Sequence, residues 1–300
     1  MNENFNLGLL GYPVSGSLSS IMHNYVLSKN NLPGKYSLIE VKDDIFLADT
    51  INDLTSQEKY IGLNITIPYK IKALDLCSDL TLEAQLTGAV NTIKYQNGIL
   101  SGHNTDIYGF RQSLNQLSNI DDLENAFIIG SGGSARAVVY ALTSLNLKNV
   151  IILTRNRITG ESLITMANNL KVIRPQLKTT YKLILLDQLP EFIDLASSLD
   201  NSLIINASPL GNHGNELPKW LDQTFASLKN KVKYYDLNYS KNRENLSSIV
   251  LANSFNIEGI DGTSMLAYQA KLAFFYWLGL DYDYELFYKP LIDFKNSNQL

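Results

Sequence analysis

The chain has 300 residues, 45% of them hydrophobic, which is enough to bury a large core in one or two domains. Its net charge of −4 comes without a basic stripe or a block of like charge, so we expect neither nucleic acid nor an anionic membrane as a partner. A single cysteine, Cys77, excludes an internal disulfide, and the three scattered histidines (23, 103 and 213) lack ligand-like spacing, so we expect no metal. No apolar run approaches the roughly 18 residues of a membrane span, and the first residues do not read as a secretion signal, so we expect a cytoplasmic protein.

The first hundred residues alternate strand and helix signals. The apolar runs LGLLGY, YSLIEV and YIGLNITIP predict strands, and helices are expected over about residues 19–29 and 45–54. This βαβαβ rhythm implies a mostly parallel sheet. The segment AVNTIKYQNGILSGHNTD then predicts a β-hairpin that turns at Gln96-Asn97-Gly98, because Asn-Gly is the favoured two-residue turn. A helix is expected over 107–117.

A second series of apolar strands follows, near residues 126–130, 149–154, 181–186, 202–206 and 232–237. Their spacing is typical of a doubly wound, Rossmann-like sheet. The part after residue 245 is largely helical, and its segment MLAYQAKLAFFYWLGL is amphipathic enough to pack back on another domain. We therefore expect an α/β protein of two domains, a mostly parallel-sheet domain of 1–106 with C-terminal helices of 245–300 packed back on it, and a dinucleotide-binding domain of 107–244.

The segment FIIGSGGSARA runs from a short apolar strand into a glycine-rich turn and then a helix. Glycines are needed there because the turn requires backbone angles that a Cβ obstructs, and because a diphosphate must approach the main-chain amides closely. The unpaired N–H groups at the start of the helix then meet the negative charge. The turn predicts a dinucleotide site that contains Gly130, Gly132, Gly133, Ser134 and Ala135.

The segment after the next strand indicates which cofactor is bound. NAD-selective sites usually place an acidic residue there, about 20 residues past the glycines, to accept from the ribose 2′-hydroxyl. This chain has Thr154-Arg155-Asn156-Arg157 instead. Two guanidinium groups without a carboxylate favour a 2′-phosphate, and hence NADP. The structural alternative is a pair of solvated arginines on a surface loop.

Polar residues also stand near the ends of the predicted strands of the first domain, where ligands of α/β sheets bind. They are Ser15, Ser17 and Ser19 after the first strand, Lys70 after LNITIP, Asn91 and Thr92 in AVNT, and Asp106 before the next helix. Each has a simpler structural reading. Ser19 and Asp106 could be helix caps, Asn91 a turn residue and Lys70 a solvated charge.

Taken together, the motifs of the chain resemble those of the shikimate dehydrogenase family along nearly its whole length. They are, in order, GYPVSGSLSSIMHN, LNITIPYK, GAVNT, GHNTD, GSGGSARA, INASPLG, YDLNYS and DGTSMLAYQA. The resemblance implies a first domain that binds shikimate and a second that binds NADP. It also implies reversible, NADP-dependent reduction of 3-dehydroshikimate to shikimate, a step of chorismate and aromatic amino acid biosynthesis.

The resemblance assigns roles to residues at matching positions. Lys70 and Asp106 match the catalytic pair, and Ser17 and Ser19 match the serines that hold the substrate carboxylate. Five more residues match positions that contact the carboxylate side of the substrate ring or its hydroxyls. They are Asn64, Thr66, Asn91, Tyr239 and Gln269. Beyond the glycine turn and the arginine segment, the later motifs add the cofactor positions Asn206, Ala207, Ser208, Leu237, Gly262 and Met265.

Several positions depart from the family pattern. In the adenosine segment Arg155 is kept, while its neighbours Thr154 and Asn156 are exchanged relative to the usual Asn-Arg-Thr. Gly16 and Ser20 replace a basic residue and a proline beside the substrate serines, which affects loop stiffness more than chemistry. Ser264 replaces a glycine beside the expected nicotinamide position.

Rival functions on the same fold are a quinate/shikimate dehydrogenase that uses NAD or NADP, and a noncatalytic NADP-binding sensor. A methylenetetrahydrofolate dehydrogenase does not explain the paired serines or the NTD segment. The expected partner is a small-molecule substrate, and the expected assembly is a monomer or a homodimer.

Overall fold

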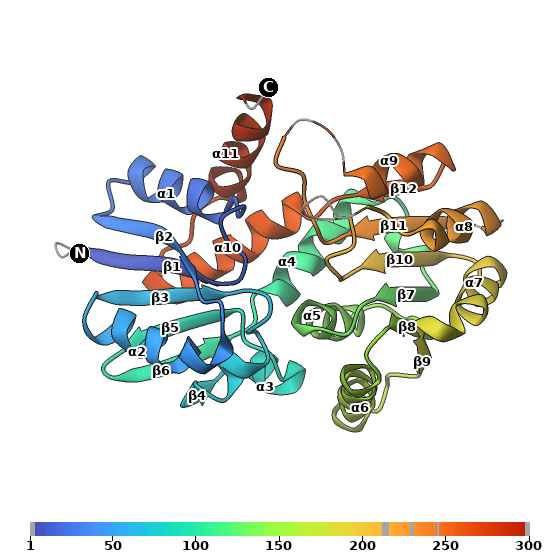
Figure 1. Cartoon of the computed structure of the whole chain (residues 1–300), viewed down its shortest axis with the longest axis horizontal. Coiled ribbons are helices and arrows are strands. Elements are labelled where there is room, and N and C mark those ends of the chain that lie inside the picture. The colour runs from blue at the N-terminus through green and yellow to red at the C-terminus, as the bar shows by residue number, and fades with distance from the viewer. Residues whose placement is uncertain (1–3, 212–215, 229–230, 243, 245, 298–300) are drawn as a thin grey trace. The chain divides into compact units, whose positions relative to one another are not determined.

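The structure is a computed structural model that describes residues 4–211, 216–228, 231–242, 244 and 246–297 (Figure 1). The chain forms two compact units. The first unit comprises Met1–Phe110 and Ser264–Leu300, and the second unit is Arg111–Thr263. Histidine 213, named above for its lack of ligand spacing, lies outside the described residues.

The first unit contains a six-stranded sheet with the order β2-β1-β3-β5-β6-β4, which the labels of Figure 1 follow from top to bottom in that unit. The pairs β1/β2, β1/β3 and β4/β6 are parallel, whereas β5 runs antiparallel to both β3 and β6. The strands are β1 Phe5–Gly11, β2 Gly34–Glu40, β3 Tyr60–Ile65, β4 Asp79–Leu80, β5 Thr92–Gln96 and β6 Ile99–His103. The predicted hairpin is confirmed, with left-handed φ values of 54° at Asn97 and 80° at Gly98.

The first unit also contains helices, two of which come from the C-terminal part of the chain. They are α1 Ser19–Lys29, α2 Leu47–Ser56, α3 Leu82–Thr87, α4 Asp106–Ser113, α10 Thr263–Leu278 and α11 Tyr284–Ser297, with 3-10 turns at Asp44–Phe46 and Lys72–Leu74. The return of the chain to the first unit is confirmed by α10, because Trp277 Nε1 donates to the Ile93 carbonyl at 2.9 Å. Gly62 makes room for the indole, since a Cβ there would lie 2.6 Å from the ring.

The second unit contains a fully parallel six-stranded sheet with the order β12-β11-β10-β7-β8-β9. Its strands are β7 Asn125–Ile129, β8 Asn149–Thr154, β9 Thr180–Leu185, β10 Ser202–Asn206, β11 Val232–Asp236 and β12 Glu258–Ile260. The helices are α5 Gly133–Leu142, α6 Arg157–Ile173, α7 Leu189–Ser198, α8 Lys219–Ser227 and α9 Ser247–Ser254, with 3-10 turns at Leu114–Gln116, Ile120–Asp122 and Leu186–Gln188. This order is doubly wound, with the reversal of strand order between β7 and β10.

The compact units divide the chain at other residues than the sequence predicts. Residues 107–110 group with the first unit, and the segment up to Thr263 groups with the second. The reason is β12, a strand in a segment expected to be helical, which pairs in parallel with β11. The expected boundary residue 245 itself lies outside the described residues.

Within the part of the chain that the structure describes, no helix has both the length and the apolar character that a membrane span requires.

Candidate functional site

The polar residues of the first unit meet at one edge of its sheet. Strand β3 ends at Ile65, and β5 begins beside it because the two strands are antiparallel and pair Asn64 with Thr92. Strand β6 ends at the same edge, where His103 pairs with Thr92. Asn91 therefore precedes its strand instead of following one, and it reaches this edge only because β5 reverses direction.

A short ion pair forms the centre of this edge. Lys70 Nζ lies 2.6 Å from Asp106 Oδ2, and the two side chains are only 14% and 7% exposed. Asn91 Nδ2 donates to the other carboxylate oxygen, Asp106 Oδ1, at 2.8 Å. The backbone of Lys70 is held as well, because its carbonyl accepts from the Val90 amide at 2.8 Å. The ammonium and the carboxylate are thus placed by contacts from both sides.

A buried hydrogen-bond network continues from Asn91. Its Oδ1 accepts from the Thr105 amide at 2.7 Å and from Thr92 Oγ1 at 2.9 Å. Asn64 Nδ2 donates to Thr92 Oγ1 at 3.0 Å, and Tyr36 OH donates to Asn64 Oδ1 at 2.9 Å. The expected site residues Asn64 and Asn91 therefore belong to one network with the ion pair.

Gln269 of α10 joins the network at its edge, where Thr105 Oγ1 lies 3.4 Å from Gln269 Oε1. Among the connecting side chains, Thr92 is one of the expected polar residues, whereas Thr105 and Tyr36 are absent from the predicted site. The two threonines stand beside predicted residues in AVNT and HNTD, which is a usable signal. Tyr36 lies within β2 and carries no such signal.

Ser17 and Ser19 form a separate pair at the start of α1. Ser17 Oγ donates to Ser19 Oγ at 3.0 Å, and the Ser19 amide donates back to Ser17 Oγ at 3.2 Å. The helix is capped at Leu18 without a side-chain hydrogen bond, so Ser19 is not its N-cap. In the described residues neither hydroxyl bonds to the Lys70 network.

Two further expected substrate residues have different surroundings. Thr66 follows β3, and its amide donates to the Leu10 carbonyl at 2.9 Å, which ties the ends of β1 and β3 together. Tyr239 follows β11 and therefore belongs to the second unit, not the first.

The glycine turn of the second unit has two kinds of glycine. Gly130 has a φ of +116°, and a Cβ there would lie 2.9 Å from the carbonyl oxygen of Ala207, so backbone geometry requires glycine. At Gly132 a Cβ would meet nothing within 4 Å. Packing therefore does not explain Gly132, and the open space before the first turn of α5 suits a diphosphate. Ser131 Oγ anchors the turn to Thr154 Oγ1 at 2.8 Å and Thr159 Oγ1 at 2.6 Å.

The polar residues that follow β8, Arg155, Asn156 and Arg157, have different surroundings. Asn156 caps α6, because its Oδ1 accepts from the Thr159 amide at 3.1 Å. Arg157 lies 3.6 Å from Glu161 in an exposed ion pair. Arg155 is exposed and pairs with no carboxylate among the described residues. Its guanidinium is available to an incoming anion.

The loops after β10 and β11 lie beside each other and beside the glycine turn. The Leu237 amide donates to the Asn206 carbonyl at 2.9 Å, and Ser208 Oγ donates to Asn206 Oδ1 at 2.7 Å. The Gly262 amide donates to Asn238 at 2.8 Å, and a Cβ on Gly262 would lie 2.1 Å from the Leu237 carbonyl oxygen. Close approach of two backbones therefore requires this glycine.

Beyond Gly262, the buried residues Ser264 and Met265 lie in α10 of the first unit. The hydroxyl of Ser264, the residue that departs from the family pattern, bonds to Tyr284 OH at 2.8 Å. The extra side-chain oxygen is thus paired with α11.

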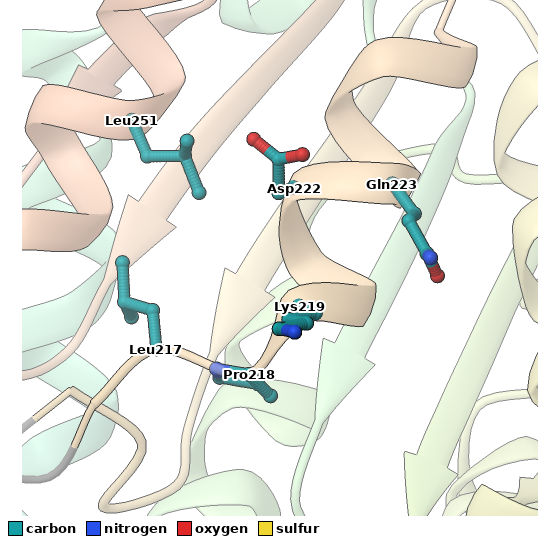
Figure 2. A pocket seen from close by; sticks show the side chains of 6 residues that line it. All are labelled: Leu217, Pro218, Lys219, Asp222, Gln223 and Leu251. Atoms are coloured by element: carbon teal, nitrogen blue, oxygen red, sulfur yellow. The ribbon is translucent and has the colours of Figure 1, made fainter.

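The pocket shown in Figure 2 lies elsewhere in the second unit. It has a volume of about 360 Å³, and Leu217 and Leu251 point toward each other across it. None of its lining residues is an expected site residue. A search of the described residues finds no group of three or more His, Cys, Asp or Glu side chains that could hold a metal ion.

Comparisons with known proteins identify the family. The family described as "Shikimate dehydrogenase substrate binding domain" matches residues 9–93. The shikimate dehydrogenase (NADP(+)) of Prochlorococcus marinus strain MIT 9515 is 33% identical over 95% of this chain and 96% of its own length. That of Clostridium botulinum strain Hall is 34% identical over 91% of this chain and 96% of its own length.

Solved structures lead to the same family. A shikimate dehydrogenase crystallised in complex with NADP⁺ superposes with a TM-score of 0.81 at 30% identity, over 97% of this chain and 95% of that one. The enzyme of Thermus thermophilus in complex with shikimate has a TM-score of 0.76 at 26% identity, over 96% and 98% of the two chains. With relatives more than 30% identical over nearly its whole length, the chain belongs to the shikimate dehydrogenase family.

Proposed function

We propose that the chain is an NADP-dependent shikimate dehydrogenase, which reversibly oxidises the C3 hydroxyl of shikimate to the ketone of 3-dehydroshikimate. In the direction of aromatic amino acid biosynthesis it reduces the ketone. The observation that carries the proposal is the shielded pair of Lys70 and Asp106, 2.6 Å apart at the edge of the first sheet.

This pair suits the chemistry at the substrate oxygen. A ketone that gains hydride develops alkoxide charge, so it needs a proton donor and a positive charge within hydrogen-bond reach. We assign the proton transfer to Lys70 and the orientation of its ammonium to Asp106. Asn91 holds the second oxygen of that carboxylate, which leaves the first oxygen for the ammonium. NADP, when bound, supplies the nicotinamide that exchanges hydride with C3.

The substrate residues are assigned by the chemistry of their polar groups. Ser17 and Ser19 would bind the substrate carboxylate, and the finding that Ser19 is not the N-cap of α1 supports this role. Asn64, Thr66, Asn91, Tyr239 and Gln269 would bind the remaining oxygens. Each carries an amide or a hydroxyl, the groups that ring hydroxyls require as partners.

The cofactor residues are assigned to the edge of the second sheet where its strand order reverses. The space in front of Gly132 and the first turn of α5 would take the diphosphate, and Arg155 the 2′-phosphate. The loops that contain Asn206–Ser208 and Leu237 would line the nicotinamide end, and Gly262 and Met265 are the remaining candidates for that end.

We also propose that the protein acts on its small-molecule substrate in the cytoplasm as a monomer or a homodimer. The single, half-buried cysteine, Cys77, supports the cytoplasm. Light scattering after gel filtration measures the assembly.

The test is the rate of NADPH formation with shikimate and with quinate, each repeated with NAD⁺. Shikimate with NADP⁺ should give the largest kcat/KM. A larger value with quinate would assign the chain to the quinate branch, and no turnover on either substrate, with intact NADPH binding, would make it a nucleotide-binding sensor.

Two lysine variants make this test specific. Lys70→Ala should abolish most turnover, whereas Lys72→Ala should not, because Lys72 is 56% exposed and pairs with Asp44 away from the network. Equal loss in both variants would contradict the assignment of Lys70.

A further inference from the structure

A carboxylate that the expected site does not include lies at the centre of the second unit. Asp236 ends β11 and is 1% exposed. Its Oδ2 accepts from Ser248 Oγ at 2.6 Å and from Tyr234 OH at 3.1 Å. Its Oδ1 accepts from the amide of Asn238 at 2.9 Å and from Asn238 Nδ2 at 2.8 Å. Asn206 Nδ2 lies 3.1 Å from both oxygens.

These donors come from two different regions of the unit. Tyr234 and Ser248 are buried in strand β11 and helix α9 and fix the carboxylate from the core side. Asn206 is the last residue of β10, at the start of the loop that follows it, and Asn238 stands on the loop that follows β11. The carboxylate of Asp236 is therefore the point at which the core holds both loops.

Asn206 and Asn238, which Asp236 holds, bond in turn to further loop residues. Asn206 Oδ1 accepts from the amide and the hydroxyl of Ser208, at 3.1 and 2.7 Å. Asn238 Nδ2 donates to the Ser208 carbonyl at 2.9 Å, and the Asn238 carbonyl accepts from Gly262 at 2.8 Å. The positions of Ser208, Leu237 and Gly262 thus depend on a single buried side chain.

The chemistry of the donors requires a carboxylate at this position. Every group around Asp236 presents an N–H or O–H, and only a carboxylate accepts at both of its oxygens. In the described residues no lysine or arginine pairs with it, so its charge is balanced by hydrogen bonds alone. Burial raises the pKa of Asp236, and the bonds from Ser248, Asn206 and Asn238 oppose that rise. Such a costly group is unlike an ordinary core residue.

We propose that Asp236 is a positioning residue for hydride transfer, which sets the loops at Asn206–Ser208 and Leu237–Asn238 against the nicotinamide end of the cofactor. The proposal rests on the proposed function, because that function assigns these loops to the nicotinamide. Asp236 is 1% exposed and would act through its hydrogen bonds with Asn206 and Asn238.

The experiment compares two ligands that report on different ends of the cofactor site. NADPH reaches both ends, whereas 2′,5′-ADP carries only the adenosine 2′-phosphate half. Asp236→Asn presents donors to donors and should loosen both loops. We expect kcat to fall about ten- to a hundredfold, the range for a displacement of reacting groups by about 1 Å, and NADPH to bind more weakly. Affinity for 2′,5′-ADP should change less than twofold.

Two more variants separate positioning from folding. Asn238→Ala removes the link between the loops but leaves Asp236 bonded to Tyr234, Ser248 and Asn206, so it tests the proposal if Asp236→Asn does not fold. It should lower kcat in the same sense. Thr224→Val removes a buried 2.7 Å bond to the Trp220 carbonyl in α8 and touches neither loop. It should destabilise the unit without changing kcat.

Unchanged kcat and NADPH affinity in folded Asp236→Asn or Asn238→Ala would overturn the proposal. So would an equal loss of NADPH and 2′,5′-ADP affinity, which indicates a general structural role. Failure of the proposed function has a different signature, because wild-type protein would then not turn over shikimate. Selective weakening of NADPH by Asp236→Asn would in that case still locate the loops at the nicotinamide end.

Discussion

The two expected sites are built in opposite ways. In the first unit the functional side chains bond to one another, and Asn64, Asn91 and Asp106 are each 5% exposed or less. In the second unit the glycine turn offers open space at Gly132, and Arg155 stands exposed. The first site is a network of buried side chains, whereas the glycine turn of the second presents backbone and open space.

The difference follows from what each site must bind. Stabilising charge that develops during a reaction requires donors and charges that are already fixed in place, because reorganisation at that moment costs free energy. A diphosphate carries its charge permanently and is satisfied by backbone N–H groups at a helix start. Changes in the first unit should therefore alter the chemical step or substrate binding, and changes at Arg155 should alter only cofactor choice.

The largest expected effect is that of Lys70→Ala. Loss of the proton donor should lower kcat by roughly 10²–10⁴, the range for a general acid or base, with a smaller change in KM for shikimate. Steady-state kinetics in both directions measure it. Normal turnover in the folded variant would remove Lys70 from the mechanism, and with it the contrast between the two sites.

Asp106→Asn should come next. It removes the negative charge that faces the Lys70 ammonium and places an amide opposite Asn91 Nδ2. We expect kcat to fall by about 10–10³, with the fold preserved because the side chains are nearly equal in size. If kcat were the same as in the wild type and only KM for shikimate were raised, Asp106 would bind a substrate hydroxyl instead.

The double variant Ser17→Ala/Ser19→Ala should act on substrate binding. A hydrogen bond to a charged acceptor contributes about 1.5–3 kcal/mol, and the two hydroxyls already bond to each other, so their losses overlap. KM for shikimate should rise about ten- to a hundredfold, and KM for NADP⁺ should stay within twofold. The opposite pattern would assign the serines to the cofactor.

Arg155→Ala tests the second unit in the same way. It should lower the kcat/KM of NADP⁺ relative to NAD⁺ by about ten- to a hundredfold, because NAD⁺ has no 2′-phosphate. Arg157→Ala is the matched control and should act less, since Arg157 pairs with Glu161. High salt should reduce the NADP⁺ preference of the wild type in part, by screening an exposed charge. If the ratio of kcat/KM for NADP⁺ to that for NAD⁺ changed neither with salt nor in Arg155→Ala, other residues would determine the cofactor preference.

The smallest effect concerns the core behind the first site. His23 is fully buried and stacks on Tyr36 with ring centroids 4.3 Å apart, and its ring nitrogens have no hydrogen-bond partner among the described residues. Burial lowers the pKa of His23 from 6.5 to about 3. Between these values the unfolded chain binds a proton that the folded chain does not. Stability from this group is therefore complete above pH 6.5 and is lost as pH falls, by roughly 2 kcal/mol at pH 5.

His23→Leu removes this titration. Urea unfolding should show the variant close to the wild type at pH 8 and more stable than it at pH 5. Met22→Leu, a buried change on the same helix, should show no pH-dependent difference from the wild type. A parallel loss of stability in His23→Leu and the wild type between pH 8 and pH 5 would show that His23 does not titrate on unfolding.

The sequence alone determined the features that depend on local geometry. The glycine turn at Gly130, the Asn97-Gly98 hairpin and the helix at Ser19–Lys29 were predicted because a positive φ or a helical period leaves a mark on consecutive residues. The family motifs named the candidate residues by position, and the doubly wound order of the second sheet followed from the spacing of its strands.

Only the tertiary structure decided which of these residues bond to one another. Asn91 reaches Asp106 because β5 reverses direction, and β12 joins the second unit because it pairs with β11 across a long connection. Tyr36, Thr92 and Asp236 gained their partners in the same way, through contacts between segments far apart in the chain. Such contacts depend on strand order and burial, which no stretch of consecutive residues records.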